Sequence, residues 1–151
     1  MKIPNKMKYI EIKKFGPAEG LKLSEIDVPD INKNEVLIKV YASGVNRPDI
    51  LQRLGQYPSP KGASTIPGLE VAGKIIKIGK NIKSFKLGDK VCALTHGGGY
   101  AQYCKVYWKH ILPLPKGYNY IEAAAIPENF FTVWFNLIDI GSLKKSDTVL
   151  I

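Results

Sequence analysis

The most distinctive part of the chain reads Ser43-Gly-Val-Asn-Arg-Pro-Asp-Ile-Leu-Gln-Arg-Leu-Gly-Gln-Tyr-Pro-Ser-Pro60, and it is followed closely by Ile66-Pro-Gly-Leu-Glu-Val-Ala-Gly-Lys-Ile75. Asn46 belongs to the residue types that cap helices, and Pro48 falls in the first turn, where a missing backbone N–H costs least. The first stretch therefore predicts a short helix that starts at Asn46.

Three further residues of this stretch carry side chains that can act together. Asp49 and Arg53 are four residues apart, so a helix places them on one face, where they can form an ion pair. Tyr57 stands between Gly55 and Pro58, which makes it an aromatic ring on a stiff loop. Without further information, these residues describe a well-capped loop with an ordinary ion pair and a tyrosine over the core.

The segments on both sides of this stretch alternate apolar and polar residues, which is typical of half-buried antiparallel strands. They are short and are separated by turns that contain glycine, proline or asparagine. Short strands with such turns favour a barrel or a sandwich, so the chain is predicted to be mainly β. The predicted strands are 8–12, 21–28, 35–41, 71–78, 90–94 and 101–106.

The pattern changes to helix near Asn119. That residue can cap an alanine-rich helix over 121–126, with Glu122 at the capping-box spacing. The segment 128–140 is apolar on nearly every face and ends at Gly141, which predicts a buried helix with a glycine C-cap. The last run, 148–151, is apolar and suits a strand of a parallel sheet covered on both faces.

Composition excludes several classes of protein. The chain has 151 residues and a formal net charge of +9, but only two of its 22 basic residues are arginines, and its lysines are dispersed. Dispersed lysine predicts a solvated surface rather than a nucleic-acid site. The longest nearly uncharged stretch, 130–138, is about half of the roughly 20 residues that a membrane span needs. With two cysteines and no secretion signal, we expect a cytoplasmic protein without membrane contact.

Two other groups of residues resemble known chemical sites. The glycines of His96-Gly97-Gly98-Gly99 resemble an oxyanion loop, but the chain has no Gly-x-Ser-x-Gly elbow, so they are interpreted as a tight turn. Cys92, Cys104, His96 and His110 are the residue types of a tetrahedral metal site. Because their spacing fits no such site, the residues predict no bound metal.

Many short motifs occur in the same order as in the quinone oxidoreductase branch of the medium-chain dehydrogenase/reductase superfamily, and the chain resembles that branch from Met7 onward. The motifs are Asn46-Arg-x-Asp49, Arg53-x-Gly55-x-Tyr57-Pro58, Gly68-x-Glu70-x-x-Gly73-x-Ile75, Gly88-Asp89-Lys90-Val91, Gly98-Gly99-Tyr100-Ala101, Leu114-Pro115, Glu122-Ala-Ala-Ala125 and Phe131-Thr132-Val133-Trp134.

The resemblance implies a domain organisation. Residues 1–126 would form a GroES-like β-barrel catalytic domain, and residues 127–151 a connecting helix and the first strand of a Rossmann domain. The rest of the cofactor domain, with the glycine-rich turn that holds the pyrophosphate, would lie beyond Ile151. We therefore expect this chain, as a truncated portion, to be inactive alone, and the full-length form to be a homodimer.

The resemblance also indicates chemistry without zinc. Zinc alcohol dehydrogenases resemble this chain but carry Cys where Asn46 stands and His where Leu69 stands. Without a Lewis acid an unactivated carbonyl is not polarised, whereas a quinone accepts hydride readily because it becomes an aromatic hydroquinone. The implied activity is hydride transfer from NADPH to a quinone, with NADH not excluded as the cofactor.

The same resemblance assigns roles to three residues. Asn46 would hydrogen-bond the nicotinamide half of NADPH, Thr132 would position its carboxamide, and Tyr57 would form an aromatic wall over the quinone pocket. Asn46 and Tyr57 are thus the catalytic candidates, and all three are cofactor-binding candidates. Two alternatives stay open: a zinc-free enoyl or alkenal reductase of the same superfamily, and a non-catalytic GroES-like binding module.

Overall fold

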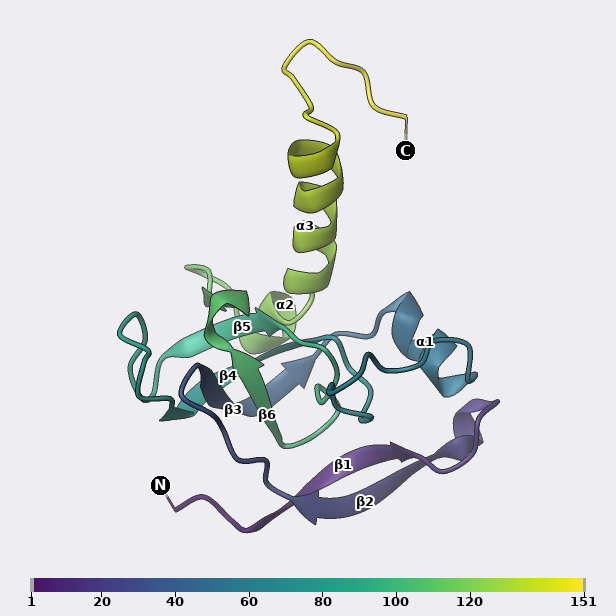
Figure 1. Cartoon of the computed structure of the whole chain (residues 1–151), viewed down its shortest axis with the longest axis vertical. Coiled ribbons are helices and arrows are strands. Elements are labelled where there is room, and N and C mark those ends of the chain that lie inside the picture. Colours follow the sequence, from purple (N-terminus) through teal and green to yellow (C-terminus); the bar gives the residue numbers. More distant parts are fainter. Residues whose placement is uncertain (1, 151) are drawn as a thin grey trace.

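The computed structural model describes residues 2–150, which form two β-sheets and a few short helices (Figure 1). The smaller sheet pairs two antiparallel strands, and the larger sheet has five strands in the order β6-β3-β4-β5-β7, with all neighbours antiparallel. The strands are β1 (Lys6–Ile12), β2 (Leu21–Asp27), β3 (Glu35–Ser43), β4 (Glu70–Ile78), β5 (Lys90–Leu94), β6 (Tyr103–Tyr107) and β7 (Ile111–Pro113).

All six predicted strands are present, and β7 is an addition. Three residues are too few for an alternation pattern, which is why the sequence did not predict it. Pro113 lies at its end, opposite Val91 of β5. A proline is tolerated there because β7 is the last strand of the sheet and has a neighbour on only one side.

The core lies on the central strands β3 and β4. Val36, Ile38, Val71 and Ile75 are fully buried and pack in one apolar cluster, with Ile38 directly opposite Ile75 in the register. Gly73 is required between these strands, because a Cβ there would lie 2.0 Å from the Lys39 carbonyl oxygen. The absence of a side chain at Gly73 therefore allows β3 and β4 to pack this closely.

The predicted barrel does not close through hydrogen-bonded strands among the described residues. The two sheets are joined by a single bridge between Tyr9 and Ala101, with bonds from the Ile10 N–H to the Tyr100 carbonyl (2.8 Å) and from the Gln102 N–H to the Lys8 carbonyl (3.0 Å). The prediction of a mainly β fold is confirmed, with two sheets that do not form one continuous hydrogen-bonded ring in the described residues. A loop rather than a strand makes the junction.

Helical segments lie at the ends of the strands. Asn119 caps α2 (Tyr120–Ala123) as predicted: its side chain accepts from the backbone N–H of Ile121 (2.8 Å) and of Glu122 (3.0 Å). The other helical segments are η1 (Ala18–Gly20), α1 (Arg47–Arg53), η2 (Trp108–His110), α3 (Pro127–Val133) and η3 (Trp134–Ile140), the last being π-helical.

The helix over 127–140 exists, but the prediction that it is buried is wrong. It stands away from the sheets in Figure 1, and Phe130 and Trp134 are 66% and 61% exposed. Apolar composition predicted burial, yet beyond its first turn most of this helix is left uncovered by the described chain. Gly141 ends it with a right-handed φ of −72°, and the left-handed residue is Ser142, with φ 49°.

The predicted Rossmann strand over 148–151 makes no strand ladder in residues 148–150, and Ile151 lies outside the described residues. A strand needs a hydrogen-bonded neighbour, so this assignment stays a prediction. Over the part of the chain that is described, no helix has the length and apolar character that a bilayer span requires.

Candidate functional site

Two carboxylates are buried close to the start of α1 and of β4. Asp49 is 4% exposed and Glu70 is 2% exposed, although charged groups are rarely buried without partners. Both belong to the distinctive stretches of the sequence, and both are bonded to Asn46. These contacts define the candidate site, which we call the Asn46 network: Asn46, Asp49, Gly68, Glu70, Tyr100 and Glu128.

Asp49 is held by three donors that carry no charge. Its carboxylate accepts from the Asn46 backbone N–H (2.9 Å), the Gly68 backbone N–H (3.0 Å) and the Tyr100 hydroxyl (3.0 Å). The predicted ion pair with Arg53 does not form, and the buried Arg53 Nε has no hydrogen-bond partner in the described structure. Neutral donors, two of them distant in the sequence, bind the Asp49 carboxylate in place of Arg53.

Glu70 links two parts of the chain that are distant in sequence. Its Oε1 accepts from the Asn46 side-chain amide (2.9 Å), and its Oε2 accepts from the backbone N–H of Glu128 in α3 (3.0 Å). Gly44 is close beside it, because a Cβ there would lie 2.0 Å from Glu70 Oε1. The carboxylate thus fills a space shaped for it and ties the start of α1 to the start of α3.

Several groups near these two carboxylates have raised pKa values, mainly because the groups are themselves buried and to a smaller extent because of the two charges. The pKa of the Tyr100 hydroxyl is raised by desolvation, by the charge of Asp49, by its hydrogen bond to Asp49, and by the charge of Glu70. The pKa of Glu128 is raised by burial and by the charges of Glu70 and Asp49. Burial raises the pKa of the Cys92 thiol to about 11, with a smaller contribution from Glu70. The site therefore disfavours any additional negative charge.

The three predicted site residues lie in different surroundings. Asn46 is in the network. Thr132 is exposed on α3, the helix that Glu70 holds by its first turn, and its carbonyl accepts from the Asn136 side chain (2.8 Å). Tyr57 is 42% exposed and lines a separate cavity of about 440 Å³, together with Phe15. The network thus includes Asn46 and reaches the helix that carries Thr132, but it does not include Tyr57.

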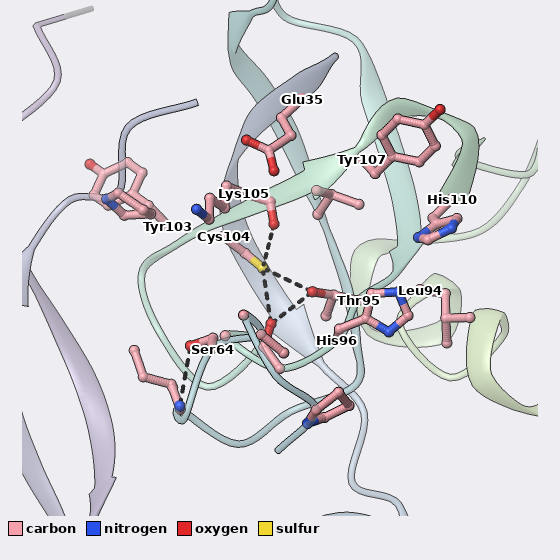
Figure 2. A pocket seen from close by; sticks show the side chains of 18 of the residues that line it. Glu35, Ser64, Leu94, Thr95, His96, Tyr103, Cys104, Lys105, Tyr107 and His110 are labelled. Carbon is pink, nitrogen blue, oxygen red and sulfur yellow. Dashed lines mark hydrogen bonds between the residues drawn. The ribbon is translucent and has the colours of Figure 1, made fainter. Parts of the chain in front are cut away.

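A second cavity, of about 380 Å³, lies between β2 and the β5–β6 region and is lined by none of the three predicted residues (Figure 2). Cys104 Sγ lies 3.6 Å from Thr95 Oγ1 there, and burial raises the pKa of its thiol to about 11. His96 and His110 meet edge to face, 5.3 Å between ring centroids, and the pKa of His110 is lowered by burial and by His96.

Within residues 2–150, no three or more His, Cys, Asp or Glu side chains are grouped so that they could hold a metal ion. The Asn46 side chain is hydrogen-bonded to Glu70, and Leu69 is half-buried.

Sequence reasoning found Asn46 but gave no role to Glu70 or Tyr100, and it gave Asp49 only an ion pair with Arg53. Glu70 occurs within the otherwise apolar run 66–73, and an acidic residue in the middle of such a run is a signal of a buried, bonded carboxylate. Its partners could not be read from the sequence, because Asn46 and Glu128 are 24 and 58 residues away.

Comparisons with known proteins show the family of the chain. The family described as "Alcohol dehydrogenase GroES-like domain" matches residues 32–116. The quinone oxidoreductase of Sus scrofa is 37% identical over 147 residues, which cover 96% of this chain and 45% of that protein. The 2-methylene-furan-3-one reductase of Solanum lycopersicum is 36% identical over 160 residues, covering 98% and 41%.

A solved structure is similar over the same extent. The quinone oxidoreductase of Coxiella burnetii has a TM-score of 0.81 at 27% identity, covering 94% of this chain and 47% of that one. The chain thus spans about half the length of the relatives that it matches. It belongs to the alcohol dehydrogenase GroES-like domain family, within the quinone oxidoreductase branch of the medium-chain dehydrogenase/reductase superfamily.

Proposed function

We propose that this chain is the catalytic-domain part of an NADPH-dependent quinone oxidoreductase that transfers hydride to a quinone without zinc. The observation that carries the proposal is the engagement of Asn46 by the buried Glu70, in a chain that is 37% identical to a quinone oxidoreductase over nearly all its length. An amide stands where the zinc enzymes of the superfamily carry a thiolate ligand, and amides have little affinity for zinc.

The residues present suit the nicotinamide end of such a cofactor. A carboxamide needs both donors and acceptors, which the Asn46 amide and the Thr132 hydroxyl can provide. Asn46 is connected to the start of α3 through Glu70, and Thr132 is exposed on the same helix. The reduced nicotinamide supplies the hydride when it is bound. The part played by this chain is to hold that ring beside the acceptor, which makes proximity the main contribution to the rate.

Substrate choice follows from the absence of a Lewis acid in this proposal. Tyr57 lies on the wall of the 440 Å³ cavity, with Phe15 and Pro58 beside it, so an aromatic acceptor would meet mainly apolar surface there. Quinones need no polarisation by a metal, because reduction makes them aromatic. Their oxygens can take protons from water, and no side chain of the network is needed as a donor.

An enone reductase is the second candidate. It is supported by the similarity to the tomato 2-methylene-furan-3-one reductase, whose name describes reduction of an α,β-unsaturated ketone. Such a substrate also accepts hydride without a metal when its carbonyl is hydrogen-bonded. The two candidates share the cofactor and the Asn46 network and differ in the acceptor.

The experiment compares acceptors in the full-length protein. NADPH oxidation is measured with a benzoquinone and with an α,β-unsaturated ketone, before and after metal removal. We expect faster turnover with the quinone, no loss on chelation, and no turnover by the 151-residue chain alone. Faster turnover with the ketone selects the second candidate, and activity that requires added zinc overturns the zinc-free proposal.

Two variants test the site assignment in the same assay. Asn46→Ala and Tyr57→Phe should each lower kcat/KM by roughly tenfold or more, as expected when a positioning hydrogen bond or wall is lost. Asn81→Ala and Tyr107→Phe, which change exposed residues outside the site, serve as controls. Unchanged kinetics for both site variants would remove Asn46 and Tyr57 from the mechanism.

A further inference from the structure

We infer that Glu70 is a positioning residue of this site: its carboxylate orients the Asn46 amide and fixes the start of the Thr132-bearing helix at the same time. The inference rests on the proposed function for the roles of Asn46 and Thr132. Neither the motif nor the comparisons give Glu70 a role, and its two carboxylate oxygens make the contacts involved.

Each carboxylate oxygen of Glu70 makes one of the two contacts. Oε1 accepts from Asn46 Nδ2 at 2.9 Å, and Oε2 accepts from the Glu128 backbone N–H at 3.0 Å. An amide is planar, so when Nδ2 faces Glu70 the carbonyl Oδ1 of Asn46 must lie on the opposite edge. Glu70 thereby selects one of the two orientations that the amide could adopt.

The second bond acts on the helix. The first backbone N–H groups of a helix have no partner inside it, and a carboxylate at that end is favoured by the helix dipole. Glu128 lies in the first turn of α3, so its N–H is one of these groups. Most of α3 beyond this turn is exposed, and the anchoring contact therefore matters for where Thr132 is held.

The charge on Glu70 is what makes both bonds possible. An ionised carboxylate accepts at both oxygens, whereas a glutamine would offer one acceptor and one amide that donates. In Glu70→Gln one of the two donors, Asn46 Nδ2 or the Glu128 N–H, then faces another donor. The shape of the residue is kept, so the loss is one of hydrogen bonding and not of packing.

This reasoning predicts a rescue. In Asn46→Asp the new carboxylate faces Glu70, and two negative charges repel. When Asn46→Asp is combined with Glu70→Gln, the glutamine carbonyl can accept from Glu128 and its amide can donate to the aspartate. The double variant restores both bonds with the donor and acceptor exchanged, and it still presents an acceptor oxygen on the far edge of residue 46.

The activity test is a double-mutant cycle in the full-length protein. Glu70→Gln should lower kcat by roughly tenfold to a hundredfold with the KM for quinone within about twofold, because orientation is lost more than binding. The Asn46→Asp/Glu70→Gln variant should be more active than either single variant. Glu35→Gln, which changes a carboxylate that caps the Asn32 N–H, should leave kcat unchanged. Effects of the two single changes that simply multiply would overturn the inference.

A second measurement on the 151-residue chain does not need activity. In the NMR spectrum, the Asn46 side-chain N–H₂ and the Glu128 backbone N–H should exchange slowly with solvent, and at least one of them should lose this protection in Glu70→Gln. If both groups exchange as fast in the unchanged chain as in the variant, Glu70 does not hold them. If the full-length protein reduces neither acceptor but this protection is seen, the proposed function fails while the anchoring by Glu70 stands.

Discussion

The central strands and the helix over 127–140 have similar apolar composition but opposite surroundings. Ile38 of β3 is fully buried, whereas Ile140 at the end of η3 is 64% exposed. The strands have partners within the chain on both sides, and the helix contacts the sheets mainly at its first turn. Apolar composition therefore indicates which residues can be buried, but the presence of a partner decides whether they are.

The largest expected effect comes from matched substitutions in the two regions. Ile38→Ala should destabilise the chain by about 2–5 kcal/mol, because it leaves a cavity among fully buried neighbours. Ile140→Ala should change the free energy of unfolding by less than about 0.5 kcal/mol. Urea unfolding followed by circular dichroism measures both. Equal effects would mean that the helix is covered in solution, and the comparison would fail.

The buried thiols of the larger sheet should make the stability of the chain depend on pH. Burial raises the pKa of Cys104 from 9.0 to about 11, so the unfolded chain ionises first as pH rises. The stability that the neutral thiol contributes is complete below about pH 9 and is lost between about pH 9 and about pH 11, by at most about 2–3 kcal/mol. Urea midpoints across this range check the fall.

The control for this pH dependence removes both thiols, Cys92 and Cys104, by substitution to alanine. The stability of that variant should fall less steeply over the same range than the stability of the unchanged chain. An equally steep fall in the variant would contradict the assignment to the thiols. Residues 127–140 contain no cysteine, so the effect belongs to the sheet.

The next prediction concerns Asp49, the buried carboxylate of α1. Asp49→Asn should cost about 1–3 kcal/mol, because an amide cannot accept from all three of its present donors. Tyr100→Phe removes only the hydroxyl donor and should cost less. Thermal unfolding of both variants gives the order. A larger loss for Tyr100→Phe would show that packing of the ring outweighs the hydrogen bonds of the carboxylate.

The smallest effects are expected for two asparagines, one that caps α2 and one within α3. Asn119→Ala should cost about 1 kcal/mol, because two N–H groups of α2 lose their acceptor. Asn129→Ala, in the exposed helix α3, removes only a bond of 3.3 Å to the Ala125 carbonyl and should cost a few tenths of a kcal/mol. Denaturant midpoints check the difference, and similar losses for the two variants would remove this distinction between a packed and an unpacked helix.

The strands and the α2 cap could be predicted because the information is local. Alternation of apolar and polar residues marks a half-buried strand, and Asn119 needs only its next three residues to act as a cap. The Asp49–Arg53 pair was predicted by the same local reasoning and is wrong, because Gly68 and Tyr100, 19 and 51 residues further along, provide the donors instead.

The candidate site shows the same limit. Asn46 could be selected from its motif, but its contact with Glu70 could not be predicted, since that contact depends on tertiary structure. Thr132 and Tyr57 remain predictions. The exposure of the helix that carries Thr132 could not be foreseen, because sequence periodicity describes the helix and not its neighbours.

The bridge from Glu70 to Glu128 also sets an order of events during protein synthesis. The two residues are 58 positions apart. At about 5–20 residues per second, the ribosome reaches Glu128 roughly 3–12 s after Glu70, which is long compared with the folding time of most small domains. The nascent chain can pair β3 with β4 during that interval, but one oxygen of this carboxylate must remain hydrated until Glu128 has been added.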